Sequence, residues 1–360
     1  MDTAHLSVYR AALLCEKMEV MEPIELLQSV VTGGDALLFE DARALMTALL
    51  QGDFSEIEMA DLLSALHERG ETATELAGFA DAMRSASLKL PLTDAERDTL
   101  VDTCGTGGDG SGTFNISTAV ALVACAAGAK IAKHGNRAVT SRCGSADVLE
   151  ALGIRTDHTP ESAAHSIRQH GFAFLLATRM HPAMKFVVPV RRALPFRTVF
   201  NLLGPMTNPA GARRQVIGVY SAAAVPLVAE ALAAGGHMAH ALVVHGAGGL
   251  DELSLSGESL VAEVKGTEVR QYTLRPEDAG GAASQDALAG GDAALNADLL
   301  TRLFAGEPGP RRDIVLLNAA AVLLVGGLCD DLQAGARMAA QAIDACKVTA
   351  LVQRLAALAQ

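Results

Sequence analysis

The sequence predicts an α/β fold that combines a small all-helical domain with a large α/β domain, whose mostly parallel central sheet is flanked by helices. Two observations support this prediction. Residues 1–96 carry apolar side chains at helical spacing, for example at Leu26, Leu27, Val30 and Val31. From Thr99 onward short apolar strands alternate with helical segments, and this alternation is typical of a parallel sheet covered by helices.

The same patterns predict the order of elements after residue 99. Strands are expected at Leu100–Thr103, Lys130–Lys133, Phe172–Ala177, Gln215–Tyr220 and Ala241–His245. Helices are expected to begin at Ser117 and about Ser145 and to cover Pro160–His170 and His181–Leu194, the last docking on the N-terminal helices. A hairpin-like pair over Leu253–Leu274, a flexible surface connection over Gly280–Asp292 and three C-terminal helices complete the prediction.

Composition and charge argue against several classes of protein. The 360-residue chain has a formal net charge of −12, which opposes broad attraction to nucleic acid. Its six cysteines have no metal-type spacing and suit reduced thiols in a cytosol. Charged residues interrupt the N-terminal segment, and the apolar runs are shorter than the roughly 20 residues that span a bilayer. We therefore expect a cytoplasmic protein with no nucleic-acid or membrane partner.

A glycine-rich loop is the most informative local feature. Five glycines lie among the eight residues from Gly105 to Gly112, between an apolar strand and an apolar helix. Glycine lets backbone N–H groups approach an anion closely, and the helix that opens near Ser117 adds unpaired N–H groups. The segment Lys133–Arg137 brings positive charge to the end of the next strand, at the same edge of a parallel sheet. The pattern predicts a phosphate site.

Other interpretations of this loop are weaker. Gly105–Gly110 matches the dinucleotide pattern G-x-G-x-x-G, but Lys133 and His134 stand where that site needs an acidic residue. No Gly-Lys-Ser/Thr sequence follows the loop, which excludes a Walker A motif. For the glycine segment a flexible linker stays open, and for Lys133–Arg137 a solvated turn does. The polar residues Asn115, Ser117 and Thr118 could serve only as caps of the helix that follows the loop.

A pair of carboxylates, Asp251-Glu252, follows the predicted strand Ala241–His245 and a glycine turn. Adjacent carboxylates repel each other unless a cation lies between them, and Mg²⁺ commonly binds one or two carboxylates together with substrate oxygens. The pair therefore predicts a magnesium site, with a solvated helix cap as the alternative.

Together these motifs resemble those of the anthranilate phosphoribosyltransferase family over nearly the whole chain. Their order and spacing fit as well as the residues themselves. The matching segments are GTGGDG and NIST (Gly105–Gly110, Asn115–Thr118), KHGNR (Lys133–Arg137), GSADVLEALG (Gly144–Gly153), HPAMK (His181–Lys185), VRR (Val190–Arg192), RTVFNLLGPMTNPA (Arg197–Ala210) and GLDELS (Gly249–Ser254).

The resemblance implies transfer of the phosphoribosyl group from phosphoribosyl pyrophosphate (PRPP) to the amine of anthranilate, in tryptophan biosynthesis. It also implies a homodimer formed through the helical domain. The two domains would comprise residues 1–96 with 182–212, which are helical, and residues 97–181 with 213–360, which form the α/β part.

The resemblance also assigns residues to each ligand. PRPP would be held by Gly105, Gly107, Asp109, Asn115, Ser117, Thr118 and Lys133, and Mg²⁺ by Ser117, Asp251 and Glu252. His134, Asn136, His181 and Arg191 would line the path of anthranilate, with Arg191 facing its carboxylate. Gly108, Thr113, Gly135, Arg137 and Ser145 complete the substrate-binding set. No residue is expected to act as a catalytic acid or base, because an arylamine is unprotonated at neutral pH; the roles are positioning and electrostatic.

Some residues near the expected acceptor channel depart from the family's usual pattern. They are Arg179-Met180, Phe186-Val187-Val188 and Pro195-Phe196, together with Cys143 in the loop after KHGNR. These departures leave a substituted aminobenzoate open as the acceptor. A phosphorylase of the pyrimidine-nucleoside type and a non-catalytic nucleic-acid-binding relative are the other classes. The intact KHGNR and HPAMK segments argue against the first, and the net charge argues against the second.

Overall fold

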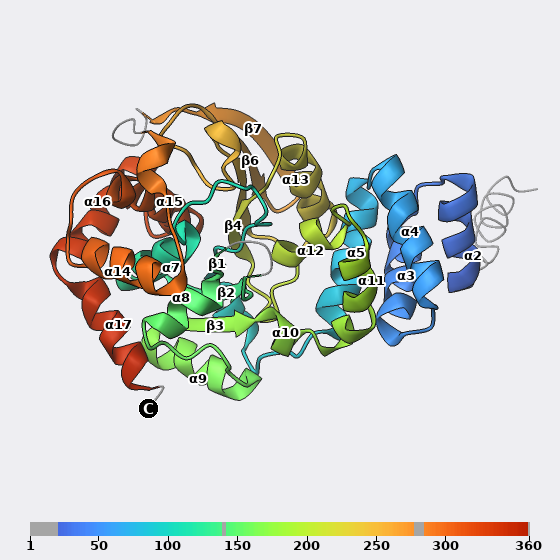
Figure 1. Ribbon diagram of the computed structural model, residues 1–360, viewed down its shortest axis with the longest axis horizontal. Helices are drawn as coiled ribbons and strands as arrows, with labels where there is room; N and C mark the ends of the chain where they lie inside the picture. The colour runs from blue at the N-terminus through green and yellow to red at the C-terminus, as the bar shows by residue number, and fades with distance from the viewer. Residues whose placement is uncertain (1–20, 139–141, 277–283, 359–360) are drawn as a thin grey trace, which may run out of the picture.

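The computed structural model describes residues 21–138, 142–276 and 284–358. A helical bundle lies at one end of the molecule, and an α/β part with its sheet lies at the other (Figure 1). This arrangement confirms the predicted fold class. The prediction of helix over residues 1–20 lies outside the described residues. No helix in the described part is long and apolar enough to cross a membrane.

The helical bundle is built from α2 (Pro23–Gln28), α3 (Phe39–Gln51), α4 (Glu56–Arg69) and α5 (Ala73–Ala86), with a short π-helix over Ser29–Gly33. The N-termini of α4 and α5 carry capping boxes, in which Ser55 and Thr72 accept hydrogen bonds from backbone N–H groups three residues on. Later in the chain, α11 (Val188–Ala193) and α12 (Phe200–Met206) pack on this bundle, as expected for the helical stretch after His181.

The sheet has seven strands in the order β3-β2-β1-β4-β5-β6-β7. The first five in that order are parallel, and β6 and β7 add an antiparallel hairpin at one edge. The strands are β1 (Leu100–Asp102), β2 (Lys130–Gly135), β3 (Phe172–Leu176), β4 (Arg214–Gly218), β5 (His240–His245), β6 (Ser259–Lys265) and β7 (Glu268–Leu274). All five predicted single strands are present, with ends shifted by up to two residues.

Helices cover both faces of the sheet because side chains alternate along each strand. Leu242 and Val244 of β5 face a core shared with α7 (Ile116–Ala126), α8 (Ser145–Ala151) and the C-terminal helices. Ala241 and Val243 face α13 (Ala224–Ala234) and are continuous with the core of the helical bundle. A third core lies under α9 (Pro160–His170). The short helix α10 (Ala177–Met180) follows β3.

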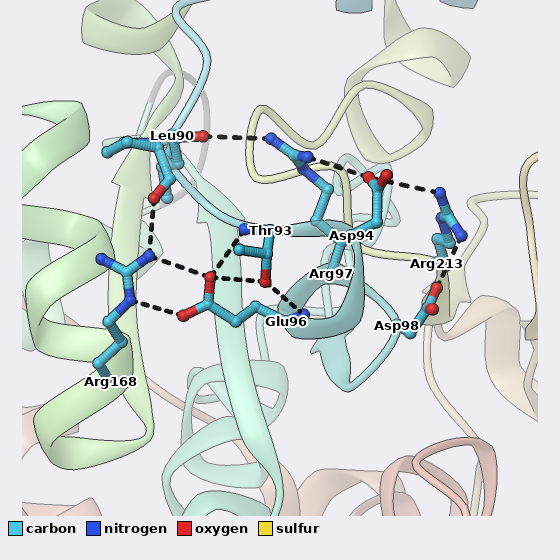
Figure 2. Close-up of polar contacts among 9 residues, drawn as sticks. Leu90, Thr93, Asp94, Glu96, Arg97, Asp98, Arg168 and Arg213 are labelled. Atoms are coloured by element: carbon cyan, nitrogen blue, oxygen red, sulfur yellow. Dashed lines mark hydrogen bonds and ion pairs between the residues drawn. The ribbon is translucent and has the colours of Figure 1, made fainter.

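The connection from the bundle to the sheet is bound to the α/β part (Figure 2). It contains the short helix α6 (Asp94–Arg97). Arg168 of α9 binds Glu96 through two nitrogen–oxygen contacts of 2.5 and 3.0 Å, and Arg213 binds Asp98 at 2.7 Å. These pairs are partly exposed, so each contributes little by itself, but together they fix the position of the connection.

The C-terminal part differs from the prediction in two respects. Four helices are present instead of three: α14 (Ala293–Phe304), α15 (Pro310–Val325), α16 (Leu332–Asp344) and α17 (Lys347–Ala357). Part of the predicted flexible connection Gly280–Asp292 lies outside the described residues. Its described part contacts the glycine loop, since Phe114 N–H donates to Leu288 O at 3.0 Å and Gly290 N–H donates to Gly112 O at 2.9 Å. These backbone hydrogen bonds hold it against the loop.

Candidate active site

The glycine loop connects β1 to α7 at the carboxyl edge of the sheet, as predicted. Thr106 N–H donates to Gly218 O at 2.8 Å, and Gly107 N–H donates to a carboxylate oxygen of Asp251 at 2.9 Å. Gly107 and Gly108 have φ angles of +62° and +74°, which favour glycine. A Cβ on Gly105 would lie 2.9 Å from Asp251, so the close approach of the loop to this residue requires glycine.

Three carboxylates meet beside this loop. Asp109, Asp251 and Glu252 place one oxygen each within 4.8 Å of one another. The Asp109 Oδ2 and Glu252 Oε2 atoms are buried and have no hydrogen-bond partner among the residues that the structure describes. Burial, followed by the charge of Asp109, raises the pKa of Asp251 to about 6. Burial and the neighbouring carboxylates also raise the pKa of Glu252 well above its usual value. Hard oxygen donors crowded in this way fit a divalent cation such as Mg²⁺.

Lys133 is the buried cation of the site. It lies within β2 and is only 1% exposed. Its Nζ donates to the backbone oxygen and Oγ1 of Thr103, both at 3.1 Å, and to Ser117 Oγ at 3.3 Å. Burial lowers the pKa of Lys133, and the carboxylates of Asp251 and Glu252 oppose this shift. The ammonium group therefore links the start of α7, which carries Ser117, to Thr103 at the end of β1.

Asp102 organises the site, although the sequence analysis did not single it out. Its Oδ1 accepts hydrogen bonds from Thr103 N–H at 2.7 Å and His134 N–H at 3.0 Å. Its Oδ2 accepts from Asn208 Nδ2 at 2.7 Å and Gln215 Nε2 at 3.4 Å. Burial raises the pKa of Asp102 to about 6. The one sequence feature that pointed to Asp102 was its position just before the glycine loop. Its partners His134, Asn208 and Gln215 are distant in sequence and are brought together only by the fold.

Two histidines face each other near the helical bundle. The rings of His134 and His181 have centroids 5.1 Å apart, and His134 Nδ1 lies 3.2 Å from Gly204 O. Both Nε2 atoms are buried without a hydrogen-bond partner in the described part of the chain. Burial lowers the pKa of His134 to about 3 and that of His181 to about 4, so both are neutral at pH 7. His181 also lines a small apolar pocket with bundle residues that include Leu50 and Met83.

Arg191 lies on α11, which packs on the helical bundle. Its guanidinium carbon is 5.1 Å from the centroid of the Phe200 ring. Burial lowers the pKa of Arg191. Among the described residues no carboxylate forms an ion pair with it. A partly buried arginine without a counter-charge is suited to bind an anionic ligand.

Of the other predicted site residues near α7, Asn115 and Thr113 have partners within the chain, whereas the Thr118 hydroxyl has none among the described residues. Asn115 bridges two segments, because its Nδ2 donates to Cys143 O at 3.1 Å and its Oδ1 accepts from Asn296 Nδ2 at 2.8 Å. Thr113 pairs with Ala289 in an isolated bridge. Thr118 Oγ1 is buried and has no hydrogen-bond partner within the described ranges.

The last residue of β2 and the two that follow it lie next to α8. Gly135 lies close to Ser145, the first residue of α8, since a Cβ on this glycine would be 3.4 Å from the Ser145 Cβ. Asn136 accepts from the N–H of Arg137 at 2.9 Å. The Arg137 guanidinium binds both carboxylate oxygens of Glu150 at 2.6 Å. Its proposed contact with substrate stays a prediction.

Comparisons with known proteins identify the family. The family model described as "Glycosyl transferase family, a/b domain" matches residues 97–348, and the model described as "Glycosyl transferase family, helical bundle domain" matches residues 24–87. An anthranilate phosphoribosyltransferase of Desulforamulus reducens is 49% identical over 89% of this chain and 92% of its own length.

Solved structures give the same result. Anthranilate phosphoribosyltransferase from Thermus thermophilus has a TM-score of 0.86 and 43% identity, covering 94% of this chain and 99% of its own. The Saccharomyces cerevisiae enzyme in complex with PRPP and Mg has a TM-score of 0.84 and 25% identity over 94% of this chain and 99% of its own. At these identities and coverages, the chain belongs to the anthranilate phosphoribosyltransferase family.

Proposed function

We propose that the protein transfers the phosphoribosyl group of PRPP to the amine of anthranilate, giving N-(5-phosphoribosyl)anthranilate and pyrophosphate. The nitrogen forms a bond to C1′ of the ribose, the bond from C1′ to pyrophosphate breaks, and the amine loses a proton. The observation that carries this proposal is the cluster of Asp109, Asp251 and Glu252 beside a glycine loop, with two buried carboxylate oxygens that lack partners among the described residues.

The donor is held at the carboxyl edge of the sheet. The glycine loop offers backbone N–H groups, and the start of α7 adds N–H groups and the positive end of a helix dipole. Lys133 supplies a positive charge that Thr103 and Ser117 hold in place. These groups are fixed before substrate binds, so they stabilise the negative charge that develops on the leaving pyrophosphate without reorganising.

Magnesium fits the carboxylate cluster because Mg²⁺ prefers oxygen ligands and the cluster offers three carboxylates. Asp251 and Glu252 would hold it, with Ser117 as a further oxygen ligand and Asp109 close to both carboxylates. When bound, Mg²⁺ neutralises charge on the pyrophosphate oxygens. The chain would fix the position of the ion through Asp251. This residue also accepts the hydrogen bond from Gly107 N–H, which connects the metal site to the glycine loop.

The acceptor is placed between the sheet and the helical bundle. Arg191 pairs with the anthranilate carboxylate, because a planar guanidinium matches a carboxylate in a bidentate geometry. His134 and His181, both neutral, offer ring nitrogens that have no partner in the described part of the chain. Asn136 completes this side of the site. The arylamine needs no strong base, so these residues position the acceptor.

The organisation of the chain follows the same proposal. The helical domain comprises residues 1–96 with 182–212, and the α/β domain comprises residues 97–181 with 213–360. Two such chains form a homodimer through the helical domain, which exposes Ile57 (74%), Leu38 (62%) and Ile24 (41%). The enzyme acts in the cytoplasm, where its cysteines stay reduced.

Anthranilate fluorescence tests the function directly. Purified protein, Mg²⁺, PRPP and anthranilate are mixed, and each component is omitted in turn. Loss of fluorescence only in the complete mixture supports the proposal. If fluorescence persists while PRPP still binds in calorimetry, the acceptor assignment is wrong, and substituted aminobenzoates are tested in the same assay.

A further inference from the structure

Arg197 lies on the segment between α11 and α12, beside the glycine loop. Its Nη2 donates a hydrogen bond to the carbonyl oxygen of Gly108. Its guanidinium carbon is 4.3 Å from the centroid of the Tyr220 ring, which is the geometry of a cation–π contact. One arginine side chain therefore contacts both the glycine loop and Tyr220, which lies two residues after the end of β4.

The hydrogen bond to Gly108 fixes a peptide plane that is otherwise free to rotate. Gly108 has a φ of +74°, and a glycine backbone can leave such a conformation without steric cost. The peptide bonds of the described residues are trans, so the Gly108 carbonyl and the Asp109 N–H point in opposite directions. By holding the carbonyl, Arg197 sets the direction of the Asp109 N–H. It thereby also fixes the backbone from which the Asp109 side chain reaches the carboxylate cluster.

Tyr220 completes a closed set of contacts around the loop. Its backbone N–H donates to Thr106 Oγ1 at 3.0 Å, and Thr106 N–H donates to Gly218 O at 2.8 Å. Arg197 then reaches from the Tyr220 ring to Gly108. Both sides of the Thr106–Gly108 turn are thus anchored to the same short segment after β4.

The residue next to Arg197 contacts the helical bundle instead. The Phe196 ring stacks on His67, in the last turn of α4, with centroids 4.3 Å apart and planes inclined by 12°. Phe196 is one of the positions that depart from the family's usual pattern. The adjacent residues Phe196 and Arg197 therefore contact the bundle and the phosphate loop, respectively. The connection that contains α6, by contrast, is held by α/β residues (Figure 2).

We propose that Arg197 is a positioning residue for the loop that binds magnesium and PRPP, and that the Phe196–Arg197 pair couples this loop to the helical bundle. The proposal rests on the proposed function for the identity of the ligand. Arg197 acts through the backbone of Gly108 and through Tyr220, so its loss affects the donor more than the acceptor.

The first test compares Arg197→Ala with Arg270→Ala. Arg270 is a matched control, because its guanidinium carbon also lies over a tyrosine ring. It is 5.6 Å from the centroid of the Tyr272 ring, in the hairpin of β6 and β7. Titration calorimetry with PRPP and Mg²⁺ should show about a fivefold to tenfold weaker affinity for Arg197→Ala, since an exposed charge-assisted hydrogen bond is worth only part of its buried value. Arg270→Ala should match the wild type.

Steady-state kinetics separate positioning from a general loss of structure. For Arg197→Ala the KM for PRPP should rise in the same proportion, while the KM for anthranilate changes less than twofold and thermal melting matches the wild type. Arg197→Lys, which keeps a cationic donor, should recover part of the loss. Donor affinity within twofold of the wild type in Arg197→Ala would overturn the role, as would an equal effect of Arg270→Ala.

A double-variant cycle tests the coupling. Phe196→Leu, which removes the stack on His67 but keeps an apolar side chain, should weaken PRPP binding, and adding it to Arg197→Ala should cause little further loss. The coupling would be overturned if the losses of PRPP affinity in the two single variants multiply in the double variant. It would also be overturned if Phe196→Leu binds PRPP as well as the wild type. If the wild type binds PRPP but leaves anthranilate unchanged, the proposed function fails, while the PRPP titrations still decide the role of Arg197.

Discussion

Replacing Arg191 with glutamine should remove the recognition of the acceptor carboxylate and leave the donor site intact. In the structure the guanidinium is partly buried, lies over the Phe200 ring and has no ion pair with a carboxylate of the described residues. Glutamine keeps a hydrogen-bond donor and an acceptor but removes the charge and the bidentate geometry.

The size of the effect follows from the kind of bond lost. A hydrogen bond between charged groups contributes about 1.5–3 kcal/mol, which corresponds to about a tenfold to 150-fold loss in kcat/KM for anthranilate. The KM for PRPP should stay within twofold of the wild type. The free protein should melt at the same or a higher temperature, because the substitution removes a charge that burial disfavours.

A comparison of two acceptors isolates this contact. Aniline has the amine but lacks the carboxylate, and release of pyrophosphate measures turnover with either acceptor. The wild type should prefer anthranilate strongly, and Arg191→Gln should reduce that preference by the same tenfold to 150-fold factor while its low activity with aniline is unchanged. A variant that keeps the wild-type preference would refute the placement of Arg191 at the carboxylate, as would an equal loss of PRPP affinity.

Two further substitutions test the metal site and the backbone beneath it. Asp251→Asn keeps an acceptor for Gly107 N–H but should abolish Mg²⁺-dependent turnover; activity that still depends normally on magnesium would remove Asp251 from the site. In EDTA the wild type should lose stability as pH rises through about 6, because burial raises the folded-state pKa of Asp251 above its ordinary 3.8. The melting temperatures measured below and above that pH should differ less for Asp251→Asn than for the wild type. Gly218→Ala would place a Cβ 1.4 Å from the carbonyl oxygen of Asp251, so we expect a loss of more than about 2 kcal/mol in denaturant unfolding. Gly204→Ala, whose Cβ would meet nothing within 4 Å, is the control and should unfold close to the wild type.

The fold class, and the meeting of the glycine loop with the carboxylate pair at one edge of the sheet, could be predicted from the sequence. The glycine loop and the Asp251-Glu252 pair each follow an apolar strand, Lys133 lies near the end of another, and parallel strands end at one edge of a sheet. Their meeting could therefore be predicted without knowing which strands are neighbours. The five parallel strands were also located within two residues, because buried parallel strands are short, continuous apolar runs.

The lengths of the C-terminal elements were harder to predict. The chain folds into four helices there instead of three, and the segment before them binds the glycine loop. Helices α16 and α17 are separated only by Ala345 and Cys346, and neither a glycine nor a proline marks this break in the sequence. A segment rich in glycine also resembles a free linker in sequence, although its backbone hydrogen bonds hold it in place.

Only the tertiary structure decided which side chains act on one another. Asp109 joins Asp251 and Glu252 across more than a hundred residues of sequence, and Arg197 reaches the loop from the segment after α11. Arg137, in contrast, binds Glu150 at the surface. The physical reason is that a residue's type fixes what it can bind, whereas its partner depends on packing between distant elements, which no local pattern encodes.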